Sequence, residues 1–405
     1  MNRSLLAMLL VGGAAFAQRV PWTYETPPVL SSQPGDPAFL LSPGPTVVGT
    51  DTTNPNLYFW QLGQPDLSYA VGPVNSADAR GTLVAVASFN TNTVLLFQAE
   101  ADGGYSQLNT GGFTVPSPRH VALRQTVAGD FEIYVDTSSQ TIEHHALAIA
   151  GGVATFTPLT PMRVAEPPSG IAVDDRTGQL YVSQPSLGMM RVEFDTNRSF
   201  LLSIDAGHLG TLVGGVDLYP VADGGVLIFT ASPNQSQVDV HSGGGAYLGT
   251  LTVGDVDGGA GVLGTPNSLD VFAQPAPGFP RGVLVVEDSA TSNYKVISLA
   301  DVDAVFPLPQ PWIPPVIVDG GTPDAGAADG GTTDAGSADA GSRPDAGPTD
   351  GGATGAGGGS GGNSGRPPPS ADPMTPSCGC TGGPFALLPG VLLLWWIRRL
   401  RSTRS

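Results

Sequence analysis

The sequence has only two cysteines among its 405 residues, Cys378 and Cys380, and both lie near the C-terminus. Any folded domain before them therefore has no disulfide bond and must be stabilised by its own hydrophobic core. Basic residues are also scarce: Lys295 is the only lysine, and the formal net charge is −18. This acidity argues against nucleic acid or an anionic membrane surface as a partner.

Long apolar runs and amphipathic helix patterns are missing as well. The two most hydrophobic stretches, Leu5–Val11 and Phe385–Ile397, are shorter than the roughly 20 residues of a membrane-spanning helix. Between about residues 19 and 317, no window repeats apolar residues with the 3.6-residue period of a capped helix. There is no Gly-x-Ser-x-Gly, P-loop or His-Glu-x-x-His motif, which removes three common routes to hydrolysis.

The N-terminus has the three parts of a secretory signal peptide. Arg3 precedes the apolar stretch, and Ala15-Phe16-Ala17 precedes Gln18. This pattern predicts a signal peptide over residues 1–17, cleaved after Ala17, and hence an exported chain. A buried N-terminal helix is the alternative.

The segment 318–377 consists almost entirely of Asp, Gly, Ala, Thr, Ser and Pro. An aspartate recurs every five residues from Asp319 to Asp339. Such a composition lacks the apolar side chains that offset the entropy of ordering, so it predicts a disordered, self-repelling linker. A calcium-binding β-roll is disfavoured because its nine-residue spacing is absent.

The last segment, 378–405, combines Cys378-Gly-Cys380, the apolar run and a cluster of arginines beginning at Arg398. It resembles the C-terminal sorting tags of myxobacterial surface proteins. The resemblance implies a transient anchor processed near Cys378 or Cys380, with Cys378 as the sorting residue. We therefore expect contact with a membrane only through this tag, and a final location at the outer cell surface or outside the cell.

Residues 18–317 show many short apolar or alternating runs broken by Gly, Pro, Asn and Asp, which predicts an all-β domain. About 300 residues at 40 to 50 per blade give about six blades of a single closed β-propeller. A pair of β-sandwiches is the alternative, and we expect a monomer. The predicted strands are 83–89, 93–98, 120–125, 131–136, 143–150, 170–173, 180–182, 190–194, 226–231, 237–241, 248–253, 268–272, 282–287 and 294–299.

Several motifs resemble those of the β-propeller phytases. The stretch from Glu166 to Phe194 has the strand, Asp-Asp turn and Leu-Tyr-Val strand of a phytase blade. Six further segments match phytase segments in the same order along the domain: Asp36-Pro37-Ala38, Asn75–Arg80, Gly225–Ser232, Asn267–Val271, Gly282–Asp288 and Ser292–Val296. Together they cover nearly the whole domain.

The resemblance implies hydrolysis of phytate, or of another phosphorylated small molecule, with calcium ions that bind substrate phosphates and polarise water. It implies Asp36, Asp270 and Asp288 as metal ligands, and Asp78 and Arg80 as substrate-binding residues. Several expected acids are replaced, at Ser169, Ser183, Gln184, Gly214 and Asn267. We therefore expect phytate hydrolysis to be weakened or lost.

Other interpretations of these residues remain open. Asp36 and Asp270 could cap strand ends, and Asp174 and Asp175 fit a turn before Gly178. The chain is then either a phosphomonoesterase with rearranged ligands or a non-catalytic propeller for binding or structure at the cell surface. A lactonase-like calcium propeller is a third, poorer match.

Overall fold

The computed structural model describes residues 18–314, apart from residues 32, 65, 110, 193–197, 205–208 and 255–262. The predicted signal peptide, linker and sorting tag lie outside the described residues. No helix in the described part of the chain is long and apolar enough to cross a membrane.

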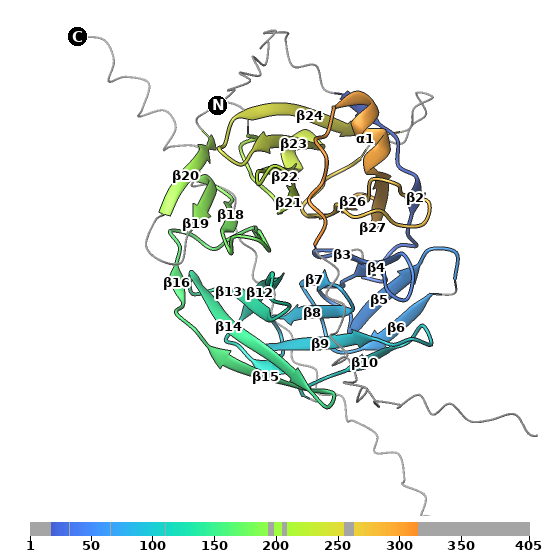
Figure 1. Ribbon diagram of the computed structural model, residues 1–405, viewed down its shortest axis with the longest axis vertical. Helices are drawn as coiled ribbons and strands as arrows, with labels where there is room; N and C mark the ends of the chain where they lie inside the picture. Colours follow the sequence, from blue (N-terminus) through green and yellow to red (C-terminus); the bar gives the residue numbers. More distant parts are fainter. Residues whose placement is uncertain are drawn as a thin grey trace, which may run out of the picture. The chain divides into compact units, whose positions relative to one another are not determined.

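Six sheets of mainly antiparallel strands are arranged around a central axis as the blades of a propeller (Figure 1). The predicted fold class is therefore confirmed. Blades 1 to 3 comprise β3 (Ala38–Leu40), β4 (Thr46–Gly49), β5 (Asn56–Gln61) and β6 (Leu67–Ala70); β7 (Ser76–Arg80), β8 (Leu83–Ser88), β9 (Thr93–Ala99), β10 (Tyr105–Gln107) and β11 (Phe113–Thr114); and β12 (Pro118–Gln125), β13 (Phe131–Thr137), β14 (Thr141–Ala150), β15 (Val153–Pro158) and β16 (Met162–Arg163).

The remaining blades use the same order of strands. They comprise β17 (Gly170–Val173), β18 (Leu180–Gln184), β19 (Gly188–Val192) and β20 (Arg198–Ser203); β21 (Val216–Pro220), β22 (Val226–Ser232), β23 (Gln237–Ser242) and β24 (Tyr247–Val253); and β25 (Leu269–Phe272), β26 (Val283–Asp288) and β27 (Asn293–Ser298). A short 3-10 helix, η2 (Pro233–Gln235), follows β22.

The N-terminal residues close the ring. β2 (Tyr24–Glu25) pairs antiparallel with β27 and forms the outer strand of blade 6. β1 (Gln18–Val20) pairs parallel with β24 at the outer edge of blade 5. Lys295 holds this closure, because its buried ammonium group binds Glu25 and lies 4.9 Å from the centre of the Trp22 ring. The ring therefore joins the first strands of the chain to the last.

The core lies between the blades, which explains the continuous apolar runs in the sequence. In β8, all six residues from Leu83 to Ser88 are buried, on both faces of the strand. A strand with alternating apolar and polar residues has one face exposed to solvent. A strand inside a blade has both faces buried, because the blade packs against a neighbouring blade on each side. One such interface, between blades 1 and 2, contains Leu57, Phe59, Val84, Val86 and Phe97.

The described residues contain one α-helix, α1 (Leu299–Val305), which the sequence patterns did not predict. The Ser298 side chain caps it by accepting a hydrogen bond from Ala300 N at 3.2 Å. Leu299 and Val302 are fully buried in the core between blades 5 and 6. The chain then runs toward the centre of the disc (Figure 1), and we call this segment, residues 306–314, the strap.

Candidate functional site

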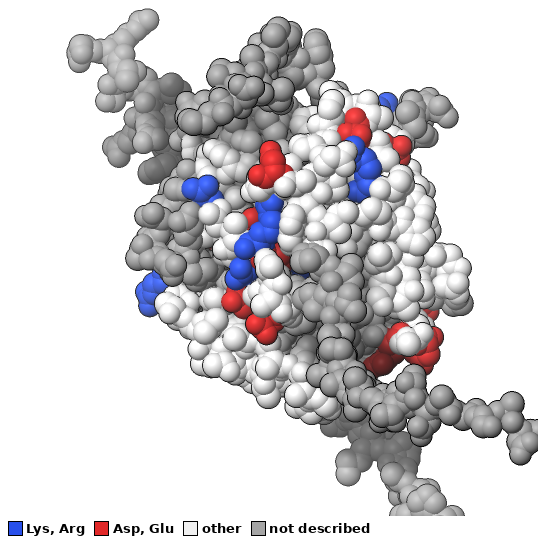
Figure 2. Space-filling view, in the orientation of Figure 1, with Lys and Arg blue, Asp and Glu red and all other residues white. Residues whose placement is uncertain are grey.

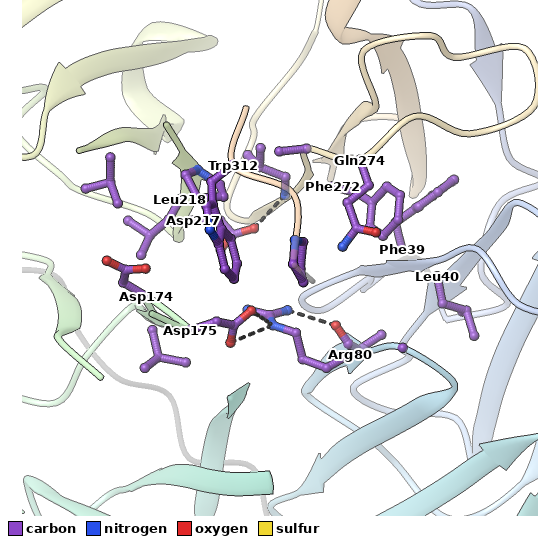
Figure 3. Close-up of a pocket in the computed structure, with 18 residues that line it drawn as sticks. Phe39, Leu40, Arg80, Asp174, Asp175, Asp217, Leu218, Phe272, Gln274 and Trp312 are labelled. Atoms are coloured by element: carbon purple, nitrogen blue, oxygen red, sulfur yellow. Dashed lines mark hydrogen bonds and ion pairs between the residues drawn. The ribbon is translucent and has the colours of Figure 1, made fainter. Parts of the chain in front are cut away.

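The innermost strands β3, β7, β12, β17, β21 and β25 surround the axis, each contacting the next. We call the face where they begin the N-face and the face where they end the C-face. A small cavity of about 30 Å³ lies among the first residues of these strands, and a larger one of about 80 Å³ lies at their ends (Figure 3). Asp217 lines both cavities.

We call the two cavities along the axis, taken together, the channel. Carboxylates that line it bind the backbone of the next blade. Asp78 Oδ2 accepts a hydrogen bond from Leu123 N at 2.6 Å, and Asp217 Oδ2 accepts one from Val271 N at 2.5 Å. Each bond joins the innermost strands of two neighbouring blades. These aspartates therefore stabilise the ring as well as lining the channel.

The predicted substrate-binding pair, Asp78 and Arg80, lies together on β7, where Asp78 lines the N-face cavity and Arg80 lines the C-face cavity. Arg80 Nη1 is 2.8 Å from Asp78 Oδ1, and its Nε is 3.2 Å from Asp175 Oδ2. Burial raises the pKa of Asp78, although the charge of Arg80 opposes this shift. Arg80 is thus held between two carboxylates of its own chain.

Negative charge is crowded around Asp217. Burial raises the pKa of Asp217 to about 7, against the opposing charge of Arg80. Burial also raises the pKa of Asp270 well above its ordinary value, and repulsion from Asp217 and Asp78 adds to the shift. The channel therefore retains protons on carboxyl groups near neutral pH.

A second ionisable group lies toward the N-face. His120 Nδ1 is 3.1 Å from Asp136 Oδ1, and His120 Nε2 is 3.7 Å from Asp36 Oδ2. Burial disfavours the imidazolium ion, yet Asp136 and Asp36 together raise the pKa of His120. Burial raises the pKa of Asp36. His120, held between two carboxyl groups, is suited to taking up and releasing a proton.

The three predicted calcium ligands do not meet at one point. Asp36 and Asp270 line the N-face cavity, whereas Asp288 is the last residue of β26 and lines neither cavity. Asp288 accepts hydrogen bonds from Gly264 N, Ala290 N and Thr291 Oγ1. In the described part of the chain, no group of three or more His, Cys, Asp or Glu is placed to hold a metal ion. A site rich in carboxylates, as calcium requires, is not formed by these residues.

The positions where the phytase resemblance expects acids do come together at the N-face. Ser169 Oγ is 3.1 Å from Ser183 Oγ, and it donates a hydrogen bond to Val213 O at 2.6 Å. Gln184 Nε2 donates to Glu166 O at 3.1 Å. The polar groups at these positions thus bind the protein backbone and bring no negative charge to a metal.

Sequence reasoning missed Asp217, the pair His120 and Asp136, and Trp312. Asp217 could have been found from the sequence, because Val-Asp-Leu repeats the apolar-Asp-apolar pattern of Asp78 and Asp270 in other innermost strands. No sequence pattern marks Trp312 as a site residue, because only the folded strap brings it to the channel. The strand predicted over residues 120–125 is observed as β12, which begins two residues earlier, at Pro118.

Charged side chains are sparse on the face seen in Figure 2. Cations and carboxylates gather near the middle of the disc and lie side by side, while most of the described surface around them is uncharged. Arg176 illustrates the pairing: its Nε is 3.0 Å from Asp174 Oδ1, and two other donors bind backbone carbonyls. Arg124 similarly binds Glu132 and the Asp175 carbonyl. These cations are occupied by acceptors of the same chain.

No family model and no curated protein match the chain. Solved structures do. A calcium-binding protein, regucalcin, from Agrobacterium tumefaciens str. C58 is 15% identical, with a TM-score of 0.45 over 70% of this chain and 97% of that chain. Selenomethionine-substituted virginiamycin B lyase from Staphylococcus aureus is 12% identical, with a TM-score of 0.40 over 65% and 81%. What this chain has in common with them is the propeller architecture described above.

Proposed function

We propose that this chain is an exported propeller, displayed at the cell surface, that resembles the phytases but binds a ligand instead of hydrolysing phytate. The observation that carries the proposal is the hydrogen-bonded group of Ser169 and Ser183 at the N-face. At these positions the resemblance expects calcium-binding acids. Hydroxyl groups bound to backbone carbonyls supply neither the charge nor the free ligands for a multi-calcium centre.

Charge supports the same conclusion. Between residues 18 and 317, 27 Asp and Glu oppose ten Lys and Arg. Phytate is a highly charged anion, and its binding requires metal ions or unpaired cations. The single lysine, Lys295, is buried and binds Glu25, and Arg80 is held by Asp78 and Asp175. A ligand without a large negative charge suits this domain better.

The test is phosphate release from phytate by the purified mature chain, with calcium and with a chelator. We expect no release above the rate without protein, and no calcium-induced rise in melting temperature. Turnover on the order of 1 to 1,000 per second with calcium would overturn the proposal. If calcium raises the melting temperature and Asp270→Asn abolishes the rise, a residual calcium site exists.

One observation favours a phosphomonoesterase as the second candidate. Asp36, His120 and Asp136 form a buried row that opens toward the N-face cavity through Asp36. Such a row can hold a proton for a leaving group. Phosphate release that is independent of calcium and disappears in Asp36→Asn, with a normally folded variant, would establish this alternative.

A further inference from the structure

The C-face cavity combines a wall of apolar and aromatic side chains with carboxyl groups. Phe39, Phe272 and Trp312 line it together with Asp217 and Asp175 (Figure 3). The rings of Phe39 and Phe272 pack at 5.2 Å, so this part of the wall is preformed. Small-ligand sites have this construction, with mostly apolar walls and a few polar groups that fix orientation.

The strap supplies part of this wall and is anchored firmly. Trp312 N donates to Pro220 O at 2.9 Å, beside the end of β21. Arg281 Nη2 binds the carbonyls of Leu308 and Pro309 at 2.9 and 2.7 Å. The Trp312 ring is therefore held at the mouth of the channel, where it is a fixed component of the cavity.

The arginines at the cavity do not leave positive charge for an anion. Arg80 is bound by Asp78 and Asp175, and Arg176, which lies 5.6 Å from the centre of the Trp312 ring, is bound by Asp174. Asp217 differs from Asp174 and Asp175, the other carboxyl groups that line this cavity, because no ion pair among the described residues includes it; its partners are the Val271 amide and the Asp270 side chain. Its charge is the one that a ligand can neutralise.

We propose that the C-face cavity binds a small organic cation, a primary ammonium carrying an apolar or aromatic group. The ammonium group binds Asp217, and the apolar group packs between Trp312 and Phe272. The acidity of the domain attracts such a cation toward the channel. This inference rests on the binding function proposed above and names its ligand class.

The probe is phenethylamine, compared with 2-phenylethanol and phenylacetate, which have a similar shape but are neutral and anionic. Binding is measured by calorimetry and by the shift of the Trp312 indole NMR signal, assigned with Trp312→Phe. We expect a dissociation constant for the amine on the order of 0.1 to 1 mM, from the usual energy per ligand atom. We expect binding of the other two to be at least about tenfold weaker.

Variants test the assigned residues. Asp217→Asn keeps an oxygen for the Val271 amide but removes the charge, and should weaken amine binding by about 10-fold or more. Trp312→Ala should weaken it about 2- to 30-fold. Asp223→Asn, in the exposed β21–β22 turn, removes the same charge outside the cavity and should change it little.

Any of these results would overturn the inference: no amine binding, tighter binding of phenylacetate, equal binding of the alcohol, or unchanged binding by a folded Asp217→Asn variant. Equal losses in Asp217→Asn and Asp223→Asn would also do so, since only net charge would then matter. The phytate assay is run on the same preparation. Phytate turnover contradicts the function proposed above, whereas failure to bind the amine without turnover contradicts only this ligand class.

Discussion

Glu287, at the end of β26, shows how a single buried carboxyl group makes stability depend on pH. Its side chain has no solvent exposure, and it accepts hydrogen bonds from Asn267 N at 2.7 Å and from Ser289. Burial raises its pKa from 4.5 to about 8. The folded state thus holds this proton more tightly than the unfolded state. Its contribution to stability is complete below about pH 4.5 and is lost as the pH rises through 8.

Glu287→Gln keeps the shape of the neutral acid but does not titrate. We therefore expect the variant to gain stability relative to the wild type between pH 5 and 9, by up to about 4 kcal/mol at the alkaline end. Urea unfolding at several pH values measures the difference. The exposed Glu100→Gln serves as the control. Parallel pH profiles for Glu287→Gln and the wild type would show that Glu287 is ionised in the folded protein.

At the scale of elements, the sequence predicts many of the strands whose two faces are both buried, but not β4 and β5 of blade 1, whose residues are also almost all buried. Gly170–Val173 is predicted with its observed bounds, and most others agree to within one or two residues. Their continuous apolar runs are local signals. β1 and β2 have three and two residues, and their partners lie more than 200 residues away, so no local pattern reveals them. The place of Trp312 at the cavity was not predicted for the same reason, because its neighbours there are distant in the sequence.

The candidate site was also predicted only in part: the motifs identify residues, but they do not show contacts between blades. Asp36, Asp78, Arg80 and Asp270 were found by their motifs, and all four line the channel. The motifs could not show that Arg80 is bound by its own carboxylates, because Asp175 is contributed by another blade. They also could not show where Asp288 lies relative to the axis. Pairing between blades is a property of the closed ring.

Closure by β1 and β2 gives a prediction for these elements. Deletion of residues 18–26 removes the outer strand of blade 6, leaves the edge of β27 unpaired and deprives Lys295 of Glu25. An unpaired edge destabilises, and so does the loss of Glu25 from the buried Lys295, which keeps only Asp288, at 3.6 Å. We therefore expect a loss of several kcal/mol and a tendency to aggregate.

A synthetic peptide of residues 18–30 should restore the melting temperature of the truncated chain by strand addition, while a peptide of the same composition in scrambled order should not. Calorimetry measures both. Equal melting temperatures for the truncated and complete chains would show that the ring does not depend on these strands.

At the scale of the whole molecule, the predicted surface display depends on segments outside the described residues. We expect that Cys378→Ser alters the location of the protein, because the resemblance to sorting tags assigns processing near this cysteine. Fractionation of cells into medium, surface and membrane measures the change. Cys380→Ser is the matched control. If both variants reach the same location as the wild type, the tag does not act through Cys378.

The pairing of β1 with β24 and of β2 with β27 also sets an order of events during synthesis. The first strands leave the ribosome long before their partners, since Gln18 pairs with Leu251 and Tyr24 with Val296. Hairpins within each blade can form as they emerge, but such distant partners meet slowly. A nascent chain therefore remains an open arc until the sixth blade is complete. Trp312 follows later still, so the cavity at the C-face is the last part of the propeller to form.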